Sequence, residues 1–170
     1  MRRLIVAEFL TLDGVMEAPG FEEHRDRKNA WALRFQTPEM QDFIRGQFAT
    51  VGAFLLGRKT YQIWAAFWPT AGGDDGFAKQ MNDLPKYVVS STLQEAEWSN
   101  STIIRGDLAE QVAELKRQPG QDILVEGSAD LVAGLIEHGL STSTSCWSSR
   151  SSWAAASISS AMGSTSGRCG

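Results

Sequence analysis

The chain has 170 residues, 42% of them hydrophobic, and a formal net charge of −4, which is the composition of a single globular domain. Residues 1–140 carry all 20 acidic groups and 14 of the 16 Lys and Arg residues, so they offer no basic surplus of the kind that nucleic acid or an anionic membrane selects. Both cysteines lie after residue 140 and no apolar run reaches membrane-spanning length, so we expect a cytoplasmic protein without a disulfide framework.

Strand-like and helix-like patterns alternate along residues 1–140. Residues 3–10 are β-rich, Thr37 and Pro38 are the cap and the first residue of a predicted helix, and residues 53–57 form an apolar strand that leads into a helix. The later predicted elements, in chain order, are a short helix at 77–84, strands at 86–91 and 101–106, a helix that begins after Asp107, a strand at 122–127 and a helix at 128–139. This alternation predicts an α/β fold with right-handed crossovers and a mostly parallel sheet covered on both faces.

Three of the predicted strands end in residues suited to phosphate, at the edge of the sheet where α/β proteins bind ligands. Glycine at such a position lets the backbone turn tightly, while cations, hydroxyls and helix N–H groups attract anions. The three strand exits are Gly57-Arg58-Lys59-Thr60, Ser90-Ser91-Thr92 and Gly127-Ser128. Each motif by itself is more often a solvated helix start, a turn or a helix cap, but the combination favours a bound dinucleotide.

Four longer stretches carry a resemblance to a known family: FLTLDGVMEAPG, LLGRKTYQIWAAFWP, MNDLPKYVVSSTL and LVEGSADLVAGLIEHGL. Together they resemble the bacterial dihydrofolate reductase-like family, which includes the reductase domain of riboflavin biosynthesis. The resemblance covers residues 1–140. It implies a three-layer α/β/α fold with a mostly parallel central sheet, NADPH as the hydride donor, and a homodimer.

The same resemblance assigns roles to individual residues. It places Gly57, Arg58, Lys59 and Thr60 at the cofactor phosphates, Ser90, Ser91 and Thr92 near the adenosine 2′-phosphate, and Gly127, Ser128 and Ala129 around the pyrophosphate. The segment 12–14 would border the nicotinamide and the substrate. We therefore expect residues 1–140 to be an NADPH-binding domain of this type.

Reduction of a C=N or C=O bond by hydride usually needs a nearby proton donor. Asp13 is the first candidate because it follows the first strand directly, although an Asp before Gly is more often a turn residue. The other candidates are Glu17, Glu22, Glu23 and His24. Trp31 could stack on a flat substrate, whereas we expect Trp64 and Trp68 to pack in the core. No cluster of His, Cys and Asp has metal-ligand spacing.

Three hypotheses about function follow from these residues. The first is an NADPH-dependent reductase that acts on a pteridine-like or ribosylaminopyrimidine-like heterocycle. The second is a nucleotide-binding sensor that uses the same phosphate sites without turnover, and the third is a structural or interaction domain. Tight NADPH binding would separate the first two from the third, and NADPH oxidation with a candidate substrate would separate the first from the second.

Residues 141–170 differ sharply from the rest of the chain, because they contain no Val, Leu, Phe, Tyr, Asp, Glu or Lys. The family pattern would continue here with an acidic turn, a long hydrophobic strand and a Leu-Gly-rich corner. One possible set of codons for residues 141–160, preceded by a single restored G, translates as VDEYLLLVFPVVLGGGKHLF, which has these features. We therefore predict that the chain is out of frame from Ser141 onward through one missing base. The alternative is a Ser-rich linker or tag.

The tail as written and the restored reading predict different structures. As written, residues 141–170 should pack irregularly and leave residues 123–126 with incomplete cover, because large aliphatic side chains are absent. If the molecule carries the restored sequence, an extended strand should run from about Ser143 to Arg150 and turn near residues 151–156. Complete buried pockets around Trp147 and Trp153 would contradict both versions.

Overall fold

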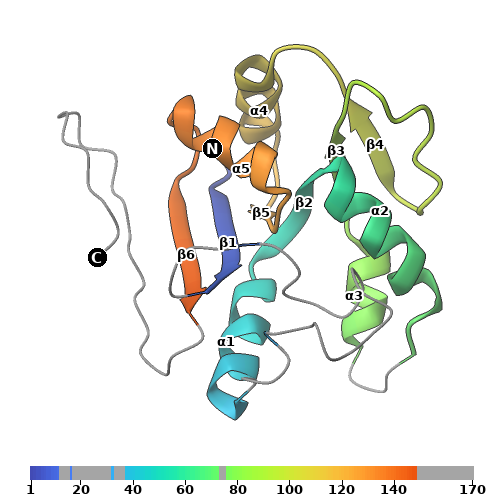
Figure 1. The fold of residues 1–170 in the computed structure, drawn as a ribbon, viewed down its shortest axis with the longest axis vertical. Helices are drawn as coiled ribbons and strands as arrows, with labels where there is room; N and C mark the ends of the chain where they lie inside the picture. The colour runs from blue at the N-terminus through green and yellow to red at the C-terminus, as the bar shows by residue number, and fades with distance from the viewer. Residues whose placement is uncertain (12–15, 17–31, 33–36, 73–75, 149–170) are drawn as a thin grey trace, which may run out of the picture.

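The computed structural model describes residues 1–11, 16, 32, 37–72 and 76–148, with the backbone alone for residues 145–148. Its elements follow the alternation that the sequence predicts (Figure 1). The strands are β1 (Leu4–Leu10), β2 (Val51–Gly57), β3 (Lys86–Val89), β4 (Ser101–Ile104), β5 (Asp122–Val125) and β6 (Ser143–Ser148). The helices are α1 (Pro38–Phe48), α2 (Arg58–Phe67), the 3₁₀ turn η2 (Trp68–Thr70), α3 (Phe77–Asp83), α4 (Leu108–Arg117) and α5 (Ala129–Glu137).

The strands form one sheet in the order β4-β3-β2-β5-β1-β6, in which each pair of neighbours is parallel. β5 lies between β1 and β2, and its Ile123 is in register with Leu4 on one side and with Ala53 on the other. The chain thus runs outward from β2 to β4 before it returns to β5. Because parallel strands share one direction, the carboxyl ends of β3, β2, β5 and β1 lie side by side at one edge of the sheet.

Helices cover both faces of this sheet (Figure 1). α4 and α5 pack on one face, through Val112, Leu115, Leu131 and Leu135, against Leu4, Val6, Ile123 and Val125. α1, α2 and α3 cover the other face, through Phe48, Tyr61 and Met81, against Ala7, Phe54, Leu56 and Leu124. The expected three-layer α/β/α fold with a parallel central sheet is confirmed.

The aromatic residues of α2 belong to the core on the second face. The Trp64 ring lies 5.5 Å from the Phe54 ring, and the Trp68 ring lies 5.5 Å from the Phe77 ring, measured between centroids. The sequence pattern that placed these side chains at helical spacing is therefore a packing pattern, as expected.

The last described strand, β6, pairs in parallel with β1, with Ile5 opposite Ser143 and Leu10 opposite Ser148. Its position agrees with the extended strand expected from about Ser143, while residues 149–170 lie outside the described residues. The tail as written led us to expect incomplete cover of residues 123–126. This is not observed for Ile123, Leu124 and Val125, which are at most 1% exposed. β5 is covered because strands flank it and helices lie on both faces. The missing base itself stays a prediction.

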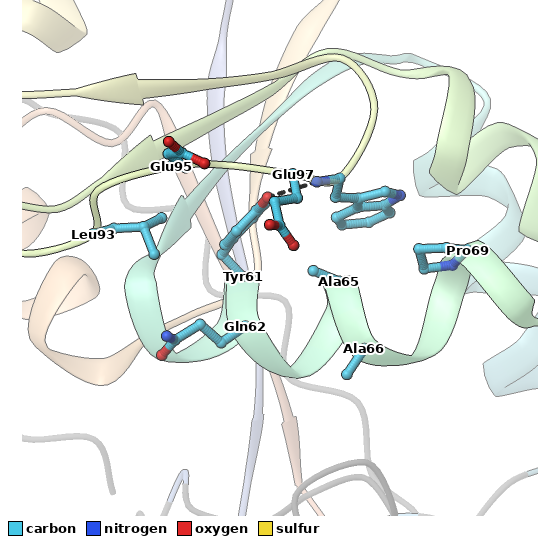
Figure 2. A pocket seen from close by; sticks show the side chains of 9 residues that line it. Tyr61, Gln62, Ala65, Ala66, Pro69, Leu93, Glu95 and Glu97 are labelled. Carbon is cyan, nitrogen blue, oxygen red and sulfur yellow. Dashed lines mark hydrogen bonds between the residues drawn. The ribbon is translucent and has the colours of Figure 1, made fainter.

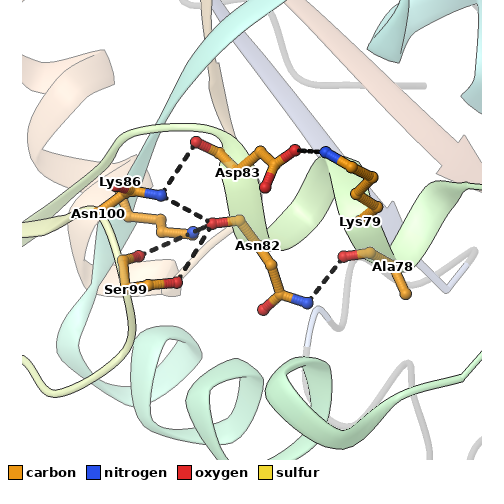
Figure 3. A network of polar contacts seen from close by, with 7 residues as sticks. All are labelled: Ala78, Lys79, Asn82, Asp83, Lys86, Ser99 and Asn100. Atoms are coloured by element: carbon orange, nitrogen blue, oxygen red, sulfur yellow. Dashed lines mark hydrogen bonds and ion pairs between the residues drawn. The ribbon is translucent and has the colours of Figure 1, made fainter.

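A buried lysine lies at the carboxyl end of α3 and forms hydrogen bonds there. Lys86 has no exposed surface, and its Nζ donates to the carbonyl oxygens of Asn82 at 2.6 Å and Ser99 at 3.0 Å (Figure 3). The same ammonium lies 4.1 Å from the centre of the Trp98 ring. Burial lowers the pKa of Lys86 to about 8, an effect that the nearby Asp83 opposes. At neutral pH the group is thus a cation at the carboxyl end of α3, where it donates to the Asn82 carbonyl oxygen.

Lys86→Met should lower the free energy of unfolding by about 2–3 kcal/mol, because the two carbonyl oxygens lose a charged donor. Methionine keeps most of the volume, so the loss reports mainly on the ammonium. Urea unfolding followed by circular dichroism measures it. Lys79→Met is the control, since Lys79 is exposed and its ion pair with Asp83 should contribute less than about 1 kcal/mol. A Lys86→Met protein as stable as wild type would contradict the assignment.

Candidate functional site

The three strand exits that the sequence singled out lie on three adjacent strands. β2 lies between β3 and β5, and Gly57 is in register with Val89, the residue before Ser90. On the other side, the Gly57 N–H donates to the carbonyl oxygen of Gly127 at 3.0 Å. The turns after β3, β2 and β5 therefore form one continuous rim along the carboxyl edge of the sheet, as expected for a ligand site of an α/β fold.

Two of these turns touch each other closely. The Oγ1 of Thr60 and the Oγ of Ser128 are 3.3 Å apart, and the Thr60 N–H donates to the Ser128 Oγ at 3.4 Å. A Cβ atom on Gly57 would lie 2.5 Å from the Ser128 Oγ, and one on Gly127 would lie 2.6 Å from the Thr60 Oγ1. Gly127 also has a φ of +94°, which favours glycine. Both glycines are required for the turns to approach this closely, and we call residues 57–60 and 127–129 the cradle.

The helices that begin in the cradle lack the side-chain caps that α1 and α4 have, as does the short helix α3. The Thr37 side chain accepts from the N–H of Met40, the third residue of α1, and the Asp107 side chain accepts from the N–H of Glu110, the third residue of α4. At α2 the cap residue is Gly57, which has no side chain, and at α5 the Ser128 hydroxyl is turned toward Thr60 instead of its own helix. Two helix N-termini without side-chain caps, side by side, suit the oxygens of a pyrophosphate.

The charges in the first turn of α2 also suit a phosphate ligand. Arg58 and Lys59 are exposed at the positive end of this helix, with no acidic residue in the first turn. Cations at a helix N-terminus are unfavourable by about 0.3–1 kcal/mol each. α1 and α4 follow the ordinary preference, with Glu39 and Glu110 in their first turns. A bound anion would offset the cost at α2, so these residues fit a phosphate ligand.

The turn after β3 is ordered by its own hydrogen bonds and by an arginine that the motifs did not include. The hydroxyl of Ser90 is buried and accepts from the N–H groups of Thr92 at 3.2 Å and Leu93 at 2.9 Å. Ser91 and Thr92 are exposed. Arg105, just after β4, donates to the carbonyl oxygens of Ser90, Ser91 and Leu93 at 3.3, 3.1 and 2.6 Å. The rule that found the other strand exits, applied to β4, would have found Arg105.

Two partly buried carboxyls at the ends of β1 and β5 were also missed. Burial raises the pKa of Glu126, directly after β5, to about 8. Burial and the charge of Glu126 raise the pKa of Glu8, on β1, to about 8 as well. Both groups are therefore largely protonated at pH 7, beside the cradle. The sequence signal was weak, since each is a single acidic residue in an apolar strand, at Glu8 in RLIVAEFL and at Glu126 in DILVEG.

Several residues of the expected site fall in parts of the chain that the structure does not describe. Asp13, Trp31 and the alternatives Glu17, Glu22, Glu23 and His24 all lie outside the described residues. Their roles stay predictions. Ala129 is described and is the first residue of α5, next to Ser128.

A separate pocket of about 490 Å³ lies between α2 and the segment that joins β3 to β4 (Figure 2). Tyr61 and Trp98 form its inner wall, where the backbone N–H of Trp98 donates to the Tyr61 hydroxyl at 3.0 Å, and Glu95 and Glu97 lie at its rim. The acidic rim is unsuited to phosphate.

Within the described residues, no group of three His, Cys, Asp or Glu side chains could hold a metal ion. The helices of the described part are all too short or too polar to cross a membrane.

Comparison with known proteins identifies the domain type. A family model described as the RibD C-terminal domain matches residues 2–144. Among curated proteins, the chain is 29% identical over 142 residues to the uncharacterized protein YyaP of Bacillus subtilis (strain 168). The matched region covers 82% of this chain and 70% of YyaP.

Three solved structures are similar in fold. A putative riboflavin biosynthesis protein from Shewanella sp. PV-4 has a TM-score of 0.61 at 16% identity, over 85% of this chain and 75% of that one. RibD of Acinetobacter baumannii has a TM-score of 0.56 at 11% identity, over 98% of this chain and 51% of that one. Dihydrofolate reductase of Schistosoma mansoni has a TM-score of 0.50 at 15% identity, over 86% and 72%. At these identities the likeness concerns the fold.

Proposed function

This chain belongs to the RibD C-terminal domain family, and on that premise we propose that it is an NADPH-dependent reductase that transfers hydride to a heterocyclic substrate. The observation that carries the proposal is the cradle. Two uncapped helix N-termini, two close-packed glycine turns and the cations Arg58 and Lys59 converge at the carboxyl edge of the sheet. This donor set fits the phosphates of a dinucleotide.

In this proposal the protein binds and orients the cofactor, and NADPH supplies the hydride when bound. The N–H groups at the starts of α2 and α5 would hold the pyrophosphate, together with Arg58 and Lys59. The exposed Ser91 and Thr92, in the turn that Arg105 orders, would meet the 2′-phosphate. Ser90 would act through the backbone of that turn, because its own hydroxyl is already engaged.

The family and the similar folds support our choice of substrate class. One similar structure is a dihydrofolate reductase and another is a putative riboflavin biosynthesis protein, so we propose a pteridine-like or ribosylaminopyrimidine-like acceptor. Trp31 would stack on its ring and Asp13 would donate the proton, as the sequence predicts. Oxidation of NADPH with such an acceptor tests turnover, and binding without oxidation by any of them would favour a nucleotide-binding sensor.

NADPH should bind at least tenfold more tightly than NADH. The 2′-phosphate adds a dianion that gains charge-assisted hydrogen bonds worth about 1.5–3 kcal/mol each, and 1.4 kcal/mol is a tenfold change in affinity. Fluorescence titration of the two cofactors at one ionic strength measures the difference. Equal affinities would refute the assignment of the Ser91–Thr92 turn to the 2′-phosphate.

Arg58→Ala should weaken both cofactors by about tenfold, because the pyrophosphate is common to them. Arg117→Ala is the matched control, since this exposed arginine of α4 pairs with Glu114 and lies outside the cradle. An unchanged affinity of Arg58→Ala for both cofactors would remove Arg58 from the site.

A further inference from the structure

Glu8 lies near the end of β1, behind the turn that we assign to the pyrophosphate. Val6 is in register with Val125, the last residue of β5, and Glu8 and Gly127 each lie two residues further along the chain. Because side chains alternate along a strand, Glu8 shares its face with Leu4 and Val6, which α4 and α5 cover. Its side chain therefore lies on the α5 side of the sheet.

A chain of hydrogen bonds joins this carboxyl to both turns of the cradle. The Gly127 N–H donates toward Glu8, and the Gly127 carbonyl oxygen accepts from the Gly57 N–H at 3.0 Å. The Oε1 of Glu8 is buried and has no hydrogen-bond partner among the described residues. A buried charged oxygen without a donor is costly, whereas a neutral carboxyl in the same place costs far less.

The surroundings of Glu8 favour its neutral form. Burial raises its pKa to about 8, the charge of Glu126 adds to the effect, and the Gly127 N–H opposes it. Next to Glu8 along the strands are Glu126, directly after β5, and Cys146, opposite Glu8 in the β6 register. Of the helices on this face, α5 carries Asp130 and Glu137, and α4 carries Glu110, Glu114, Lys116 and Arg117. The two cations are in the last turn of α4, where Lys116 contacts Arg2 and Leu140 at the start of β1, the end opposite to Glu8.

We propose that Glu8 is a positioning residue whose neutral form the cradle requires, so that binding of a dinucleotide pyrophosphate is coupled to a proton on this carboxyl. The inference rests on the proposed function. A charged Glu8 would place a negative charge behind the Gly127 N–H and reduce the positive potential at the start of α5. A neutral Glu8 leaves that potential to the pyrophosphate.

The coupling is measured by titrating the protein with NADPH between pH 7 and pH 9 at constant ionic strength. The 2′-phosphate of NADPH is already about nine-tenths dianionic at pH 7, since the second pKa of a phosphate monoester is about 6, so its own titration adds little over this range. For one coupled proton the Kd should rise roughly tenfold from pH 7 to pH 9. Calorimetry at pH 8 in buffers of different ionisation enthalpy should show an uptake of about half a proton per NADPH bound.

Three variants separate this role from a purely structural one. Glu8→Gln keeps the size and stays neutral, so its Kd should rise clearly less than the wild-type Kd from pH 7 to pH 9, with Glu126 as the carboxyl that still titrates beside the cradle. Glu126→Gln removes the charge that raises the pKa of Glu8, so the rise in Kd should begin at lower pH. Glu137→Gln, an exposed position at the end of α5, is the control and should keep the wild-type dependence.

Two results would overturn the inference: a wild-type Kd constant within twofold and without proton uptake, or a Glu8→Gln variant with the full wild-type dependence on pH. The calorimetric test needs no variant, so it stands even if Glu8→Gln folds poorly. If NADPH binds equally well at every pH, only the role of Glu8 fails. If NADPH binds at no pH, the proposed function fails and this inference fails with it.

Discussion

A Gly127→Ala variant should bind NADPH about a hundredfold more weakly than wild type, a loss of about 2.7 kcal/mol. The new Cβ would lie 2.6 Å from the Thr60 Oγ1, so the Thr60 hydroxyl must turn away from Ser128 or the turns after β2 and β5 must move apart. The N–H groups at the starts of α2 and α5 then no longer converge on one ligand. Fluorescence titration with NADPH measures the loss, and urea unfolding measures the accompanying change in stability.

Gly139→Ala is the matched control for backbone strain. Gly139 also has a positive φ, +61°, but a Cβ there would meet nothing within 4 Å. Both variants should lose about 1–2 kcal/mol of stability through strain, and only Gly127→Ala should lose cofactor binding. Adding Thr60→Ala to Gly127→Ala removes the clashing oxygen and should recover part of the stability. Wild-type affinity in Gly127→Ala would show that this turn does not hold the cofactor.

Restoring one base before codon 141 should raise the free energy of unfolding by about 5 kcal/mol. The restored segment VDEYLLLVFPVVLGGGKHLF would place Leu and Val along β6, next to β1, where the present sequence is STSTSCWSSR. Burying a Leu or Val side chain contributes about 1.5–3 kcal/mol, so two or three such side chains on the covered faces account for the gain. Urea unfolding of the two chains, expressed in parallel, measures it.

A shuffled version of the restored segment is the control for this comparison, because it has the same composition without the strand pattern. It should be no more stable than the chain as written. Equal stability of the restored and written chains would contradict the missing-base hypothesis. Sequencing the gene tests that hypothesis directly, since the restored G is either present or absent before codon 141.

Local signals in the sequence determined the order and type of the elements. The caps at Thr37 and Asp107 formed as expected, and the apolar spacing of α2 and α4 became their buried faces. These signals depend on residues a few positions apart, which is why they can be recognised without the fold. The three strand exits were found in the same way, from residues adjacent in the chain.

The tertiary structure decided which of these exits meet and which other groups join them. β5 inserts between β1 and β2, a pairing across more than 60 residues, and only this brings Gly127 against Gly57 and Thr60. The same insertion sets Glu8 behind the cradle, and the β3–β4 pairing brings Arg105 to the Ser90 turn. A lone Glu or Arg in the sequence has no distinguishing local pattern, because its burial and charge environment come from strands distant in the chain.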